Sequence, residues 1–91
     1  MEVNNSMDWL KDLIIGIKID DQERLDDVTD ILESNGYVLL AMMPFTEYNW
    51  VVAYPEDENE PMGFDVYFSC QEKIADVYYS QNEFIEKYGS K

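Results

Sequence analysis

The chain has 91 residues, of which 20 are acidic, six are basic and none is histidine, so its net charge is −14. Hydrophobic residues make up 46% and aromatic residues 14%, which distinguishes the chain from a disordered acidic tail and predicts a single acidic domain over residues 1–91. So negative a charge argues against direct binding to nucleic-acid phosphates or to an anionic membrane surface.

Two helices are predicted in the N-terminal third of the chain. In the first, over residues 6–15, apolar residues recur at i, i+3, i+4 and i+7 from Leu10 onward. The segment IGIKI overlaps the end of this helix and also alternates like a strand. In the second helix, over residues 21–34, Asp20 is expected to cap the start and Asn35-Gly36 to end the helix. Its apolar face consists of Leu25, Val28, Ile31 and Leu32.

Four segments with strand character follow. They are residues 37–45, 48–55, 63–70 and 73–79. The first, YVLLAMMPF, is apolar on both faces, which predicts a central strand covered on two sides, with Met42 and Met43 in the core. Pro44 either ends this strand or lies at an edge. Because the connections between these segments are short, they predict an antiparallel meander.

A third helix is predicted at the C-terminus, over residues 80–89. Ser80 and Glu83 match the S-x-x-E pattern of a capping box, and Gly89 follows the last apolar residue. The expected order is therefore two helices, four strands and one helix (ααββββα). We predict an α+β fold in which a four-stranded antiparallel meander sheet carries these helices.

The helix over residues 21–34 has one strongly acidic side. Its acidic residues recur with the helical period, opposite the apolar face: Glu23, Asp26, Asp27, Asp30 and Glu33. Arg24 is the only basic residue in this stretch. A solvated helix face is the ordinary explanation of such a row. Because this surface does not interleave both signs of charge, we expect it to dock a positively charged partner.

A second acidic group lies in the loop PEDENEP. Its acidic residues are Glu56, Asp57, Glu58 and Glu60, four within five residues. The segment lacks the D-x-[DN]-x-[DN]-G-x5-E spacing of an EF-hand loop, so we expect no specific metal site. This loop is the alternative to the acidic helix as the contact with a partner.

Aromatic residues form a third candidate surface. The alternating apolar residues of the segment 63–70 are expected to face the core: Phe64, Val66 and Phe68. Asp65 and Tyr67 then face outward, and Trp50 shares a face with Tyr54 on the preceding strand. Trp50, Asp65 and Tyr67 are therefore candidate contacts in an aromatic patch with an acidic rim. The alternative is that the C-terminal helix covers this patch with its own apolar side.

These features predict a binding protein that is not an enzyme and needs no cofactor. Without histidine, the chain has no Ser–His or Cys–His pair, and no glycine-rich loop could bind phosphate. By the rise of a helix, residues 23 and 30 lie about 10.5 Å apart, or about three nucleotide steps. We hypothesise an inhibitor that blocks the nucleic-acid channel of a basic nuclease, such as a CRISPR effector or a restriction enzyme, by charge mimicry.

In size, charge and lack of catalytic motifs, the chain resembles in type the small acidic proteins that phages make against host nucleases, such as anti-CRISPR and anti-restriction proteins. An immunity protein that neutralises a nuclease toxin needs the same acidic surface and is an alternative. A domain that binds a small ligand in an aromatic pocket is another alternative, and a structural or adaptor domain with incidental charge is a third.

The expected partner is the basic surface of a nucleic-acid-binding protein, with no direct contact to nucleic acid or membrane. Cys70 is the only cysteine, which excludes an intrachain disulfide and a cysteine-based zinc site and is typical of a reducing interior. The N-terminus lacks the pattern of a signal peptide, and no apolar run approaches the roughly 20 residues that span a bilayer. We therefore expect a cytoplasmic location, in the host cell if the protein is phage-encoded.

Overall fold

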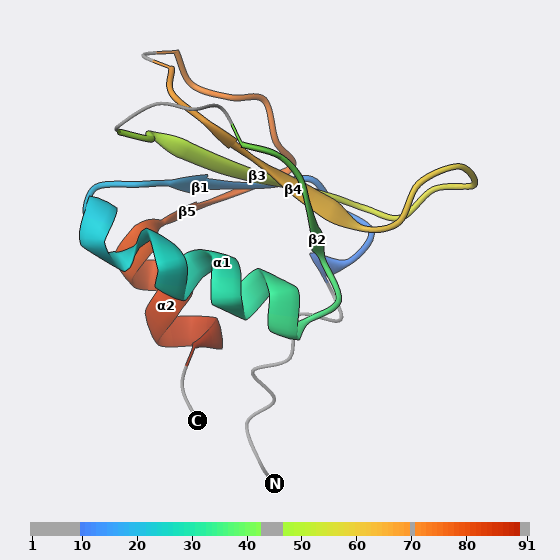
Figure 1. The fold of residues 1–91 in the computed structure, drawn as a ribbon, viewed down its shortest axis with the longest axis horizontal. Helices are drawn as coiled ribbons and strands as arrows, with labels where there is room; N and C mark the ends of the chain where they lie inside the picture. The colour runs from blue at the N-terminus through green and yellow to red at the C-terminus, as the bar shows by residue number, and fades with distance from the viewer. Residues whose placement is uncertain (1–9, 43–46, 70, 90–91) are drawn as a thin grey trace, which may run out of the picture.

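The computed structural model describes residues 10–42, 47–69 and 71–89 (Figure 1). Five strands, a short 3-10 helix and two α-helices follow one another in the order β1, η2, α1, β2, β3, β4, β5, α2. Their bounds are Ile15–Lys18 (β1), Gln22–Arg24 (η2), Leu25–Ser34 (α1), Val38–Met42 (β2), Trp50–Tyr54 (β3), Gly63–Tyr67 (β4), Val77–Ser80 (β5) and Gln81–Tyr88 (α2).

The strands form one mixed sheet in the order β2-β4-β3-β1-β5. The central strand β3 is antiparallel to both of its neighbours, β1 and β4. Each outer strand is parallel to the strand beside it, β2 to β4 and β5 to β1. The residues that connect β3 to β4, 55–62, project beyond the end of the sheet (Figure 1).

Both α-helices pack on one face of the sheet, and the main core lies between the two layers (Figure 1). The sheet supplies alternate residues, such as Ile17 of β1 and Phe64 of β4, and the helices supply Val28, Leu32 and Phe84. Each of these side chains is fully or almost fully buried. Burying one such side chain contributes about 1.5–3 kcal/mol, so this layer anchors both helices to the sheet.

The helix predicted over residues 21–34 is present, as η2 followed by α1. Its cap is Asp21 and not Asp20: Oδ1 of Asp21 accepts a hydrogen bond from the Glu23 amide at 2.9 Å. All four residues of the predicted apolar face are buried. Gly36 has a φ of +95°, so the predicted left-handed stop is confirmed at this glycine.

The predicted C-terminal helix is also confirmed. The Ser80 hydroxyl accepts from the Glu83 amide at 3.2 Å, and the Glu83 carboxylate accepts from the Ser80 amide at 3.3 Å, which completes the capping box. Helix α2 ends at Tyr88, with Gly89 as its C-terminal cap.

The predicted first helix is wrong in the part of it that the structure describes. Residues 10–13 form a turn closed by a hydrogen bond from the Leu13 amide to the Leu10 carbonyl at 2.9 Å, and Ile15–Lys18 form β1. Strand β1 lies between β3 and β5, so both of its hydrogen-bonding sides find partners, which favours the alternating interpretation of IGIKI. A Cβ atom on Gly16 would lie 3.0 Å from the Tyr78 ring, so a glycine suits this crowded position.

The four-stranded antiparallel meander is wrong as well. The strand expected at 73–79 begins only at Val77, and it pairs with β1 in parallel instead of forming a hairpin with β4. Asp76 sets this position: its carboxylate accepts from the Ile14 amide, and its own amide donates to the Ile14 carbonyl, both at 2.8 Å. Ile14 and Asp76 are 62 residues apart in the sequence, so no local sequence pattern predicts this contact.

The placement of the apolar segment 37–45 is the third error. Strand β2 was expected at the centre of the sheet with both faces covered, but it lies at an edge. All five of its residues are exposed, and Met42, expected in the core, is 47% exposed. Pro44 and Met43 lie outside the described residues. A run of apolar residues shows a low preference for water but does not show which element covers it.

Candidate functional site

The acidic residues of α1 lie on its solvent side. Asp26, Asp27, Asp30 and Glu33 are all exposed, because the opposite face of the helix is buried against the sheet. Glu23 is also exposed, but it belongs to the 3-10 turn η2 that precedes α1. The sequence pattern therefore placed this row on the correct side of the helix.

Arg24 partly neutralises one end of this row. Its Nε atom lies 3.4 Å from Oδ2 of Asp27, and its Nη1 donates to Oδ1 of Asn82 in α2 at 3.2 Å. Both members of the ion pair are about half exposed, so solvent screens their attraction. No other basic residue occurs between Asp20 and Gly36, and the rest of the acidic face keeps its charge without a local counterion from this stretch.

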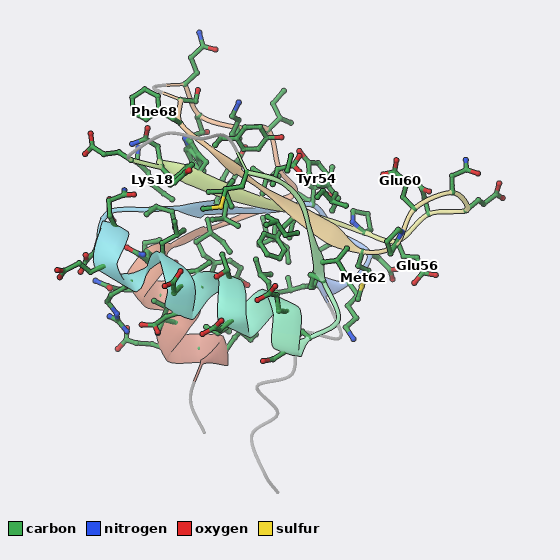
Figure 2. The ribbon with its side chains drawn as sticks, in the orientation of Figure 1. Lys18, Tyr54, Glu56, Glu60, Met62 and Phe68 are labelled. Carbon is green, nitrogen blue, oxygen red and sulfur yellow. The ribbon has the colours of Figure 1, made fainter. Side chains whose placement is uncertain are left out.

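The acidic loop has a defined backbone turn at its tip. The Asp57 carboxylate accepts from the amides of Asn59 and Glu60 at 2.8 and 2.9 Å, and the Asp57 amide donates to the Glu60 carbonyl at 3.0 Å. All four acidic residues of the loop are exposed, including the remaining two, Glu56 and Glu58. Figure 2 shows Glu56 and Glu60 at the projecting end of the sheet, well separated from α1. The structure thus presents two acidic surfaces rather than one.

The candidate aromatic patch lies on the sheet face opposite the helices. Tyr67 donates from its hydroxyl to Oδ2 of Asp65 at 2.9 Å, and the hydroxyls of Tyr67 and Tyr54 lie 2.9 Å apart. The Lys73 ammonium lies 4.2 Å from the centre of the Tyr67 ring. Burial, followed by the hydrogen bonds to Tyr54 and Asp65, raises the pKa of Tyr67 well above its usual value.

Trp50 is on the same face, but it is only 4% exposed. Its ring meets the Tyr78 ring edge-on at 6.2 Å, and the Lys18 ammonium lies 5.4 Å from it. The Tyr78 hydroxyl accepts from the Ala75 amide at 2.9 Å and donates to the Lys73 carbonyl. The segment before β5 therefore packs over this face.

The alternative, in which the C-terminal helix covers the aromatic patch, is wrong, because α2 packs with α1 on the other side of the sheet (Figure 1). Asp65 and Tyr67 remain half-buried neighbours, whereas Trp50 is enclosed. Phe68, expected in the core, follows the end of β4 and is 46% exposed.

Sequence reasoning missed the exposed apolar edge of the sheet. Val38, Leu39, Leu40 and Met42 of β2 are each between 42% and 47% exposed. The available signal was the absence of any charged residue from 37 to 46 in a chain that is otherwise densely charged. An uncharged apolar run also favours a buried strand, so this signal alone does not separate a buried strand from an exposed edge.

A groove of about 300 Å³ separates α1 from α2, with Asp27 and Asp30 on one side and Ile85 and Tyr88 on the other. Within the described ranges, no three acidic or cysteine side chains converge as metal ligands do. Neither described helix is long and apolar enough to cross a membrane. Cys70 lies outside the described residues. Comparisons of the chain with protein-family models, with curated proteins and with solved structures found no match.

Proposed function

We propose that this chain is a small acidic inhibitor, without catalytic activity, that binds the basic surface of a nucleic-acid-handling protein and blocks its nucleic-acid channel. The observation that carries the proposal is the exposed acidic face of α1, fixed to the sheet by the buried apolar face of the same helix. A fixed row of carboxylates binds a cationic channel without the loss of freedom that a flexible acidic tail would suffer.

The spacing of the row supports competition with a nucleic-acid strand. Asp26 and Glu33 are seven residues apart in one α-helix, so they lie about 10.5 Å apart along its axis. This length corresponds to about three phosphates along a strand. With a net charge of −14, the whole protein would also be steered toward a cationic channel over long range.

An immunity protein that neutralises a nuclease toxin has a different target from an inhibitor of a defence nuclease. It would bind that target in the same physical way, because it would use the same acidic surface. In either case the protein would act in the cytoplasm. Binding of a small ligand among the aromatic residues has less support, because Trp50 is enclosed and Tyr67 is engaged by its neighbours.

The test compares three variants that each remove four negative charges from the net −14. The first neutralises the helix row (Glu23→Gln, Asp26→Asn, Asp27→Asn, Asp30→Asn). The second neutralises the loop (Glu56→Gln, Asp57→Asn, Glu58→Gln, Glu60→Gln). The third is a matched control with exposed acids elsewhere (Asp12→Asn, Glu47→Gln, Glu72→Gln, Glu86→Gln).

Each protein is titrated into labelled DNA bound to restriction endonucleases, CRISPR effectors or toxin nuclease domains. We expect the parent chain to displace DNA from its target, the helix variant to lose most of this effect and the control variant to keep it. The salt dependence of binding should be flatter for the helix variant. If all three variants displace DNA equally, the arrangement of charge is irrelevant and the proposal is wrong.

A further inference from the structure

Strand β2 is an edge strand with little protection against pairing. Its sequence VLLAM contains no charged residue and no proline, and all five residues are exposed. Edge strands are usually guarded by charge, by proline, by short length or by a bulge. Only the bulge is present here, at Leu40, where the pairing with β4 skips a residue. By contrast, the opposite edge, β5, has four residues and runs directly into α2.

The backbone of β2 offers hydrogen-bonding groups on its outer side. The Val38 amide donates inward to the Met62 carbonyl at 3.0 Å. Because successive residues of a strand direct their amide and carbonyl groups to alternate sides, the N–H and C=O of Leu39 point away from β4. Within the described part of the chain, no strand pairs with this outer side. Leu39 therefore presents a donor and an acceptor to an added strand.

A groove beside the bulge favours a positively charged side chain on a partner strand. Its volume is about 280 Å³, and its lining includes Leu40, Tyr54, Pro61, Asp57, Glu60 and Asp65. The Leu40 side chain reaches the groove across Gly63, where a Cβ atom would lie only 2.4 Å from it. Figure 2 shows Tyr54 on the open side of the sheet and Glu60 at its projecting end. A lysine or arginine side chain fits such a groove, with its stem on the apolar wall and its charge at the carboxylates.

We propose that β2 accepts an extended segment of a basic partner protein as a sixth strand, with a lysine or arginine of that segment in the groove beside Leu40. The cationic character of the partner rests on the proposed function. Strand addition of this kind takes its affinity from main-chain hydrogen bonds and its specificity from side-chain pockets. A second copy of this chain fits less well. It carries a net charge of −14 and would be repelled by the acidic loop 55–62, which lies beside β2 because Gly63, directly after the loop, pairs with Val38.

The test uses synthetic peptides as probes. One alternates lysine and valine over about eight residues, enough to cover β2 at about 3.3 Å per residue. A second alternates glutamate and valine, and a third is the lysine peptide with alternate backbone amides methylated. Peptide binding is followed by fluorescence anisotropy, and hydrogen exchange of the Leu39 amide is measured by NMR. Sedimentation of the protein alone reports its association state.

We expect the lysine peptide to bind and to slow exchange of the Leu39 amide, and the other two peptides to bind at least tenfold more weakly. Leu39→Pro removes the outward N–H and should reduce affinity about tenfold, whereas Leu39→Ala keeps that N–H and should reduce it less. If Leu39→Pro does not fold, the exchange of Leu39 in the parent protein decides the question.

Three outcomes would overturn the inference: binding that leaves Leu39 exchange unchanged, equal binding of all three peptides, or self-association through β2 that Leu39→Pro abolishes. The last would make the occupant a second copy. The helix-row variant separates this inference from the proposed function. The lysine peptide should still bind this variant and slow exchange of its Leu39 amide. If Leu39→Pro no longer binds the peptide but still displaces DNA, strand addition at β2 is not needed for inhibition, and the proposed function itself is unaffected.

Discussion

The buried side chain of Gln81 holds the backbone of Asp21 by two hydrogen bonds. Its Oε1 accepts from the Asp21 amide at 2.7 Å, and its Nε2 donates to the Asp21 carbonyl at 2.9 Å. The same Oε1 accepts from the Asp20 amide at 3.1 Å. Gln81 is the first residue of α2, so these bonds join α2 to the turn that leads into α1. They therefore help to set the position of the acidic face.

Gln81→Ala should destabilise the protein by about 2–4 kcal/mol, because three backbone groups lose their part-buried hydrogen bonds and the buried side chain leaves a cavity. Urea unfolding followed by tryptophan fluorescence measures the change. The matched control is Gln71→Ala, which alters an exposed glutamine and should change the free energy of unfolding by less than about 0.5 kcal/mol. Equal effects of the two substitutions would contradict this role of Gln81.

Tyr37→Phe should leave stability unchanged or raise it by about 1 kcal/mol. Tyr37 is 1% exposed, and within the described residues its hydroxyl has no hydrogen-bond partner. Tyr88→Phe is the control, because the Tyr88 hydroxyl lies 3.1 Å from that of Tyr79 and its removal should cost about 0.5–1.5 kcal/mol. Thermal unfolding of both variants tests the contrast, and a loss at Tyr37 as large as that at Tyr88 would refute it.

The protein should lose stability as the pH rises above about 10, the ordinary pKa of tyrosine. Burial, followed by hydrogen bonding, raises the pKa of Tyr67 and of Tyr79 in the folded protein. The unfolded chain therefore releases these protons first. The stability contributed by the protonated hydroxyls is complete below pH 10 and is lost as the pH rises toward the folded pKa values.

Replacing both Tyr67 and Tyr79 by phenylalanine should flatten this pH dependence. The measurement is the difference in the free energy of unfolding between about pH 8 and about pH 11 for the parent and the double variant. Parallel curves would show that these hydroxyls do not cause the alkaline loss.

Glu33→Lys should stabilise the protein by about 0.3–1 kcal/mol at low ionic strength, because Glu33 lies in the last turn of α1, where the helix dipole favours a positive charge. Asp26→Lys makes the same change in net charge, from −14 to −12, but in the first turn, where the dipole favours an acid. It should therefore stabilise less or destabilise. Thermal unfolding with and without salt measures both, and identical shifts would mean that total charge alone matters.

The two α-helices could be predicted because their signals lie within one or two turns. The capping box joins Ser80 to Glu83, and Gly36 ends α1 by its own backbone freedom. The N-cap of the first of these helices was predicted one residue early, at Asp20, because Asp20 and Asp21 have the same side chain and only the folded backbone selects Asp21. The exposure of the acidic row follows from the same helical period, so most of this candidate surface could be located from the sequence. The alternation in β4 likewise placed Asp65 and Tyr67 on one face.

Composition and local pattern alone determined the charge of this protein, the existence of both α-helices, the cap of α2, and which side of α1 faces water. The tertiary structure decided that β1 is a strand and that β5 pairs with it at the opposite edge of the sheet from β2. It also decided that Trp50 is enclosed and that β2 is exposed. The physical reason is that caps and helical faces depend on residues a few positions apart. Strand neighbours and covered faces depend on contacts such as Asp76 with Ile14, whose energy is gained only after distant parts of the chain have met.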